Sequence, residues 1–110
     1  MTNYTVNDVV IARFRQVAGP RYKIRPVMVV LDIADDDLVV VPITSVQCRG
    51  TGDLPLVQWR QAGLSVPSFV RLAKPTLIPK RPVLRGLGRL AAMDRRQVSE
   101  TWQSLYRFAP

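Results

Sequence analysis

Residues 23–45 read KIRPVMVVLDIADDDLVVVPITS, and this stretch decides the fold. Two short runs rich in valine and isoleucine, Pro26–Ile33 and Leu38–Ile43, flank the tetrapeptide at residues 34–37. Apolar runs this short, bounded by turn residues, are typical of buried strands rather than helices. Aspartate tolerates turn geometry and bonds nearby backbone N–H groups, so residues 34–37 predict the tight end of a β-hairpin.

Further strands are expected on both sides of this hairpin. Before it, Asp8–Phe14 reads DVVIARF and has the same composition. After it, Leu54–Trp59 and Ser68–Ala73 alternate between the two faces of a strand. Three prolines within residues 75–82 then confine the next stretch to an edge strand or an irregular one.

The C-terminal segment changes to a helical period. One apolar stripe at i, i+4, i+7 and i+8 is formed by Val98, Trp102, Leu105 and Tyr106. We therefore expect a helix over Met93–Phe108, with Trp102 in the core or in a dimer interface. Strands followed by one helix in 110 residues predict a single domain over the whole chain. Its fold class is mainly β, a small antiparallel barrel or curled sheet with the helix packed on it.

The charge of the chain is strongly positive. Lys and Arg number 16 against 8 Asp and Glu, which gives a net charge of +8 and a pI near 10.8. Such an excess suits RNA, DNA, an acidic peptide or an anionic membrane surface. Most of the cations are arginines, whose planar guanidinium matches phosphate and stacks on bases, so the composition favours nucleic acid.

Several classes of protein and site are excluded by the composition. A single cysteine, Cys48, and no histidine exclude an intrachain disulfide, a cysteine-rich zinc site and histidine-based catalysis. We therefore expect no metal and no other cofactor. No apolar run approaches the roughly 18 residues that span a bilayer, and the N-terminus has no signal-peptide pattern. These absences predict a cytoplasmic protein without a membrane partner.

Catalysis by such a chain has to use other side chains. Walker-type phosphate loops and GxSxG elbows are both missing. RNA cleavage tolerates this set, because the substrate supplies its own nucleophile, the 2′-hydroxyl. The protein then aligns that group and stabilises the charge that builds up on the phosphorane, which arginines and hydroxyl donors can do.

The predicted hairpin brings one arginine and one threonine together. If its strands pair symmetrically about the aspartate turn, Arg25 lies opposite Thr44 at the open end. Both would then lie beside the polar loops expected at residues 15–24 and 45–53, and exposed loops commonly carry function. Alternatively, Arg25 is a solvated arginine and Thr44 a strand-end cap, and the residues by themselves leave both interpretations open.

Segment by segment, the chain resembles the MazF/PemK (Kid-like) toxins of type II toxin–antitoxin systems. The matching segments keep their order and spacing along almost the whole chain. They are Asp8–Phe14 (with Asn7 in place of the usual glycine), Lys23–Val30, Val41–Ser45, Trp59–Leu64, Pro67–Arg71 and Gly86–Leu90.

This resemblance implies a fold, an activity and partners. The fold is an SH3-like barrel of the CcdB/MazF type with a C-terminal helix, and it forms a homodimer. The activity is metal-independent endoribonuclease cleavage of single-stranded RNA, which leaves 2′,3′-cyclic phosphate and 5′-hydroxyl ends. A cognate antitoxin would inhibit the toxin by laying an acidic disordered tail over the RNA site.

The resemblance also assigns residues to the site. The family's Arg–Pro arginine falls on Arg25, and the threonine that follows the proline of the third strand falls on Thr44. Arginine is a poor base, because its pKa lies above about 12, so we assign Arg25 to stabilising the phosphorane and to donating a proton to the leaving 5′-oxygen. Thr44 would hydrogen-bond a nonbridging oxygen. The residues expected to hold the RNA backbone are Arg15, Arg21, Lys23, Ser45, Arg71 and Lys74.

Two departures from the family pattern keep other functions open. Ala73 stands where some members have a catalytic aspartate, and the chain lacks the first-loop histidine of those members, so the general base is not identified. One alternative is a CcdB-like toxin that binds DNA gyrase without cutting nucleic acid, an analogy of fold alone. Another is an RNA-binding barrel that has lost turnover.

Overall fold

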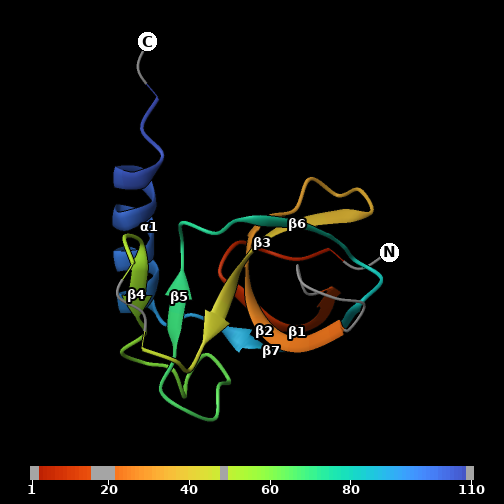
Figure 1. Cartoon of the computed structure of the whole chain (residues 1–110), viewed down its shortest axis with the longest axis horizontal. Coiled ribbons are helices and arrows are strands. Elements are labelled where there is room, and N and C mark those ends of the chain that lie inside the picture. The colour runs from red at the N-terminus through yellow and green to blue at the C-terminus, as the bar shows by residue number, and fades with distance from the viewer. Residues whose placement is uncertain (1–2, 16–21, 48–49, 109–110) are drawn as a thin grey trace.

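The computed structural model describes residues 3–15, 22–47 and 50–108, without the side chains of Phe14, Arg15 and Tyr22. Within these residues the strands form one curled sheet, and a helix follows them at the C-terminal end (Figure 1). The elements are β1 (Asp8–Arg15), β2 (Tyr22–Leu31), β3 (Asp37–Thr44), β4 (Asp53–Pro55), β5 (Phe69–Arg71), β6 (Thr76–Pro79), β7 (Val83–Arg89) and α1 (Ala92–Leu105).

The β2–β3 hairpin forms as the sequence predicts. Its strands pair antiparallel, with Val27 opposite Pro42. At the turn, Ala34 adopts a positive φ of 65°, and the carboxylates of Asp32 and Asp35 each accept a backbone N–H from two residues ahead. Side-chain bonds of this kind stabilise turns, so the aspartates have a local structural role here.

β2 begins earlier than the sequence predicts. β1 pairs with it as far as Arg15 opposite Tyr22, and this antiparallel partner extends the strand through the basic residues. Lys23 therefore lies on a strand and not in the loop that was expected at residues 15–24.

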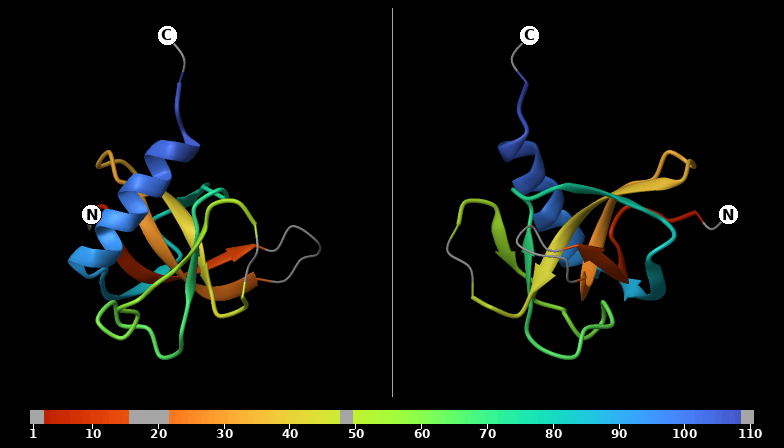
Figure 2. Two further views of the ribbon diagram at one scale, coloured as in Figure 1. Left: turned by 90° about the vertical axis from the view of Figure 1, so that its left-hand side faces the viewer. Right: turned by 45° about the vertical axis from the view of Figure 1, so that its right-hand side comes forward.

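The sheet has the order β4-β5-β3-β2-β1-β7, and β6 pairs with β3 outside this path. Strands β1, β2, β3 and β6 curl around an interior, as Figure 1 and the right-hand view of Figure 2 show. Among the described residues no pairing between β6 and β7 closes the curl, so the sheet is barrel-like but open. This architecture, with a helix packed beside it, confirms the predicted fold class.

Hydrophobic cores lie on both faces of the sheet. The core inside the curl contains Val29 and Val40. The core on the other face contains Val41, and the helix contributes Val98 to it. Successive side chains of a strand point to opposite faces, so a strand buried on both faces must be apolar throughout. This burial explains the unbroken run LVVV at the start of β3.

The segment Leu54–Trp59 is not the strand that its alternation predicts. β4 stops at Pro55, because the N–H groups of Val57 and Gln58 bond the carboxylate of Asp94 instead of a neighbouring strand. β5 is likewise only three residues long. The chain between β4 and β5 is thus a loop, residues 56–68, anchored to the helix.

The C-terminal part of the chain differs in two ways from the prediction. β7 was not foreseen as a strand, because its two glycines and the register shifts in its pairing with β1 hide the alternating pattern. The helix ends at Leu105 rather than Phe108. Tyr106 leaves the helical conformation with φ −110° and ψ 58°, and its hydroxyl donates to the carbonyl of Leu72 at 2.6 Å.

Both tryptophans are partly buried against the core beneath the helix. Trp59 packs there from the loop and Trp102 from α1, so Trp102 takes the first of the two places predicted for it, the core. Trp102 also contacts Tyr106, with ring centres 4.1 Å apart. In the part of the chain that the structure describes, no helix combines the length and the apolar character needed to cross a membrane.

Candidate functional site

Arg25 and Thr44 meet at the open end of the β2–β3 hairpin. The last pair of β2 and β3 is Val27 opposite Pro42, and Arg25 and Thr44 each lie two residues beyond it. Both residues line one surface concavity of about 340 Å³. The structure therefore brings together the two residues that the hairpin argument paired.

The guanidinium of Arg25 is free to bind a ligand. Its side chain is partly exposed and makes no hydrogen bond or ion pair with any residue that the structure describes. No Asp or Glu lines the concavity beside it. An unpaired guanidinium presents N–H donors in a planar fork that matches two oxygens of a phosphate.

The hydroxyl of Thr44 is oriented by the turn that follows β3. Its Oγ1 accepts the backbone N–H of Val46 at 3.1 Å. A threonine hydroxyl has one hydrogen to donate and two acceptor positions, so this contact leaves the hydrogen available. Thr44 is thus held as a donor next to the Arg25 fork.

A loop from far along the chain completes the concavity. Residues 64–68 face the end of the hairpin, and they bring both apolar side chains and hydroxyls. The lining residues other than Arg25 and Thr44 are Pro26, Ile43, Ser45, Val46, Leu64, Ser65, Val66 and Ser68.

This wall was missed by the sequence analysis, apart from Ser45. Segments on both sides of it, Trp59–Leu64 and Pro67–Arg71, carried the family resemblance, but nothing in them pointed to a site. Serines and apolar residues in a loop have no spacing that distinguishes a ligand-binding wall from ordinary surface. Only the docking of the loop against the hairpin shows it.

The loop is fixed by backbone hydrogen bonds at both ends. The N–H of Leu56 donates to the carbonyl of Ser68 at 3.0 Å, and the N–H of Leu64 donates to that of Trp59 at 3.1 Å. Within the wall, the Ser68 hydroxyl donates to the carbonyl of Val66 at 2.8 Å. The wall is therefore part of the folded framework.

The predicted backbone-binding lysines lie outside the concavity. Lys23 is exposed on β2, two residues before Arg25. Lys74 is exposed between β5 and β6 and does not line the concavity. The side chain of Arg15 and the whole of Arg21 lie outside the described residues.

Arg71 is engaged by an acidic neighbour. Its Nε lies 3.3 Å from Oδ1 of Asp53, and the Arg71 side chain is 38% exposed while that of Asp53 is 3% exposed. The second oxygen of Asp53 accepts the N–H of Gly50 at 3.0 Å. Arg71 is thus partly neutralised, and it does not line the concavity.

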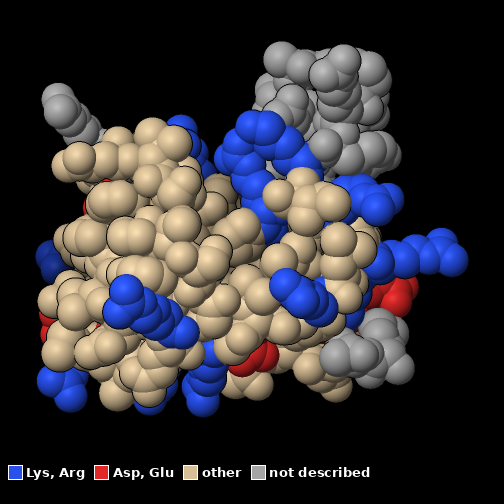
Figure 3. Space-filling view, turned by 90° about the horizontal axis from the view of Figure 1, so that it is seen from below, with Lys and Arg blue, Asp and Glu red and all other residues tan. Residues whose placement is uncertain are grey.

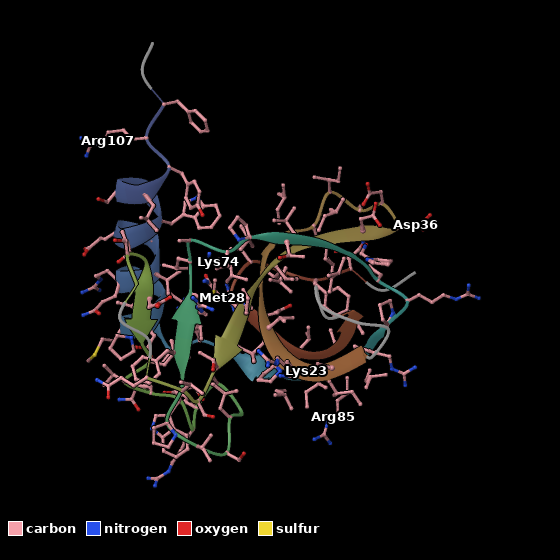
Figure 4. The ribbon with its side chains drawn as sticks, viewed as in Figure 1. Lys23, Met28, Asp36, Lys74, Arg85 and Arg107 are labelled. Carbon is pink, nitrogen blue, oxygen red and sulfur yellow. The ribbon has the colours of Figure 1, made fainter. Side chains whose placement is uncertain are left out.

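Positive and negative charge are separated along the hairpin. Figure 4 shows Lys23 near the open end and Asp36 at the turn on the opposite end. On the lower face of the molecule, Figure 3 shows Lys and Arg side chains at several separate places with small acidic areas between them. Within the described residues, no three His, Cys, Asp or Glu side chains lie together as metal ligands would.

Comparison with known proteins identifies the family of the chain. Residues 5–106 match the model of a family described as PemK-like, MazF-like toxins of type II toxin–antitoxin systems. The chain belongs to this family. Comparison with curated protein sequences finds no match.

Solved structures of MazF-like proteins share the fold. Mycobacterium tuberculosis toxin MazF-mt6 matches with a TM-score of 0.72 and 22% identity over 94% of this chain and 99% of its own. The MazE–MazF complex (Form-II) from Deinococcus radiodurans matches with a TM-score of 0.72 and 18% identity over 99% and 100%. An endoribonuclease in complex with its cognate antitoxin, from a mycobacterial species, matches with a TM-score of 0.70 and 14% identity over 96% and 97%.

The match to the MazF-like family confirms the resemblance inferred from the sequence segments. This protein is therefore a MazF-like toxin of a toxin–antitoxin system. The identities to the solved structures are too low to show more than the common fold.

Proposed function

We propose that this MazF-like toxin is an endoribonuclease that cleaves single-stranded RNA without a metal ion. The observation that carries the proposal is the juxtaposition of Arg25 and Thr44 at one concavity, with the Arg25 guanidinium unpaired among the described residues. One of the similar structures is described as an endoribonuclease from a mycobacterial species, which supports the same reaction class.

In the proposed reaction the 2′-oxygen of the RNA attacks the adjacent phosphorus, and the bond from phosphorus to the 5′-oxygen breaks. The products are a 2′,3′-cyclic phosphate and a 5′-hydroxyl end. Arg25 stabilises the negative charge of the phosphorane, and Thr44 donates a hydrogen bond to a nonbridging oxygen. The 2′-hydroxyl proton goes to solvent, and Arg25 donates a proton to the leaving oxygen and regains one from water.

The residues around Arg25 and Thr44 would contact the RNA phosphates to different extents. Lys23 and Ser45 lie beside Arg25 and Thr44 in the chain and would contact neighbouring phosphates. Arg71 would do so more weakly, because Asp53 already balances part of its charge. Lys74 would contact only a strand that extends beyond the concavity, and the contacts of Arg15 and Arg21 stay predictions.

Partners follow from the same charge distribution. An acidic disordered antitoxin tail would compete with RNA for Arg25 and the neighbouring cations, and two of the similar structures are described as complexes with an antitoxin or MazE. We also propose that the toxin forms a homodimer and acts in the cytoplasm.

The proposal is tested by incubating the purified protein with end-labelled single-stranded RNA in EDTA. We expect cleavage that survives chelation, is absent from RNA with 2′-deoxyribose at the cleaved position, and falls by at least about a hundredfold in Arg25→Ala, as when one transition-state donor is removed. Arg107→Ala is the matched control, because Arg107 is exposed beyond the end of α1 and far from Lys23 (Figure 4).

The other outcomes identify the alternatives. Binding of RNA without cleavage indicates an RNA-binding barrel without turnover. Inhibition of DNA gyrase, with neither binding nor cleavage of RNA, indicates a CcdB-like toxin. Equal activity of Arg25→Ala and Arg107→Ala would contradict the proposed role of Arg25.

A further inference from the structure

We propose that the outward side of β1, β2 and β7 is an accessory RNA-binding surface, which holds the backbone of nucleotides that extend from the concavity on one side. This inference rests on the proposed ribonuclease function and adds a length preference to it, because a longer strand gains contacts that a short one lacks. We call this surface the arginine face. It consists of Ile11, Arg13, Ile24, Pro26 and Arg85.

Strand pairing places the residues of the arginine face on one side of the sheet. Ile11 on β1 lies between Pro26 on β2 and Arg85 on β7. Residues directly opposite each other in antiparallel strands point to the same side of the sheet. Val9, two residues before Ile11, belongs to the core outside the curl, so the arginine face is on that outer side as well. Figure 4 shows Arg85 extending outward from the lower side of the curled strands.

Both arginines of this face are exposed and free to bind a ligand. Neither Arg13 nor Arg85 forms a side-chain hydrogen bond or an ion pair with any residue that the structure describes. The arginine face contains no acidic residue, whereas Arg71 elsewhere in the sheet is paired with Asp53. Unpaired guanidinium groups on an open surface match the oxygens of phosphates. The ligand we infer from this charge is a polyanion.

Pro26 connects the arginine face to the concavity, which favours RNA as that polyanion. Pro26 lines the concavity together with Arg25, and it is the cross-strand partner of Ile11. Neighbouring strands are about 4.8 Å apart, so the backbone of Arg85 lies roughly 10 Å from that of Pro26, two strands away. An RNA strand with one phosphate at Arg25 can therefore reach Arg85 within a few nucleotides.

The surface between the two arginines is apolar. Ile24, the cross-strand partner of Arg13, is 59% exposed. Sugars and bases that cover it would remove apolar surface from water, which is favourable. Arginine on an edge strand can also protect the edge from aggregation, and among the described strands β7 pairs only with β1. That role needs no RNA, so RNA binding distinguishes the two.

The test compares a core RNA that only fills the concavity with the same RNA extended by several nucleotides on either side of the cleaved bond. All strands carry 2′-deoxyribose at the cleaved position, so their Kd is measured without cleavage. The variants are Arg13→Ala, Arg85→Ala and Arg85→Lys. Arg107→Ala is the matched control, because Arg107 is an exposed arginine beyond the end of α1. Thermal melting verifies that all variants fold.

We expect Arg13→Ala and Arg85→Ala each to flatten the slope of log K against log salt by about 0.7 on one of the extended RNAs, the loss of one phosphate contact on a single strand. The slope on the core RNA should not change. Arg85→Lys should keep the slope of the wild-type protein, because the charge remains. On a cleavable extended RNA, Arg85→Ala should raise KM and leave kcat unchanged, since a contact remote from the reacting phosphorus acts equally before and in the transition state.

The other outcomes separate this surface from the ribonuclease function. Equal slopes of Arg85→Ala and Arg107→Ala on every extended RNA would overturn the arginine face as an RNA site. Loss of affinity for polyglutamate but not for RNA would identify an acidic peptide as its ligand instead. Cleavage without any dependence on length would remove this surface and leave the nuclease. Length-dependent binding through Arg85 in the absence of cleavage would keep this surface and remove the nuclease.

Discussion

The carboxylate of Asp94 accepts the backbone N–H of Gln58 at 2.8 Å, although the two residues are 36 positions apart in the chain. The other carboxylate oxygen accepts the N–H of Val57 at 2.9 Å. Asp94 itself is buried, with only 1% of its surface exposed. Asp94 lies in the first turn of α1, where the helix dipole favours a negative charge. One side chain thus joins the helix to the loop that walls the candidate site.

Replacing this carboxylate should loosen the loop and the fold together. Asp94→Ala leaves the N–H groups of Val57 and Gln58 without their acceptor, and we expect a loss of about 2–3 kcal/mol in the free energy of unfolding. Asp94→Asn keeps one acceptor oxygen and should lose less. Urea denaturation measures both, with Glu100→Ala as the control on an exposed position of the same helix. A loss in Asp94→Ala no larger than in Glu100→Ala would show that the two bonds contribute little.

Gly63 permits the closest approach between the loop and β7. It has a φ of +89°, and a Cβ added there would lie 2.2 Å from the carbonyl oxygen of Leu87. Gly63→Ala therefore combines a left-handed backbone with a clash against main-chain atoms, and we expect destabilisation of more than about 2 kcal/mol. The control is Gly86→Ala, because an added Cβ at Gly86 meets nothing within 4 Å. Equal melting temperatures of the two variants would contradict this account.

The hairpin was predictable because its information is local. The apolar runs and the aspartate turn predict the hairpin, and the hairpin brings Arg25 and Thr44 to its open end, where both line the concavity. The loop 56–68 was not predictable in the same way, because the hydrogen bonds that hold it involve Asp94, which lies far along the chain. β4 was predicted too long for that reason, since the pattern of Leu54–Trp59 contains no sign of a carboxylate on the helix.

The residues of the candidate site fall into two groups, those that local sequence predicts and those that tertiary packing adds. Arg25, Thr44 and Ser45 belong to the hairpin and its end, and they could be named from the sequence. Leu64–Ser68 enters the site through tertiary packing, so no spacing pattern identifies it. The neutralisation of Arg71 by Asp53 was hidden as well, because β4 and β5 pair only in the folded sheet, where Asp53 lies opposite Arg71.

Stability at acidic pH should report the environment of Asp32. The pKa of its carboxyl is lowered from 3.8, first by the backbone N–H of Tyr4 at 2.6 Å, then by Lys80, whose Nζ lies 2.9 Å away. A carboxyl whose pKa is lower in the folded state stabilises the fold above its unfolded pKa. That stabilisation is lost as the pH falls through the folded value. We therefore expect Asp32→Asn to be less stable than the wild-type protein at pH 7.

The measurement is thermal melting of wild-type and Asp32→Asn protein from pH 7 down to pH 2. The difference in melting temperature between them should be constant near neutrality and shrink below about pH 4, where the unfolded carboxyl takes up its proton. Asp36→Asn is the control, since Asp36 is exposed on the same turn. A difference that does not change with pH would mean that Asp32 acts through its shape and not through its charge.

RNA binding should depend on salt through the cations next to the concavity. Lys23 is exposed two residues before Arg25, so we expect Lys23→Ala to weaken binding of all RNA sequences about equally. The loss of one phosphate contact should also flatten the slope of log K against log salt by about 0.7–1. Lys74→Ala should change that slope only for RNA long enough to pass beyond β5.

Titrations of an uncleavable short and long strand between low and physiological salt measure both effects, with Arg107→Ala as the control. An unchanged slope in Lys23→Ala on both strands would remove Lys23 from the path of the RNA backbone.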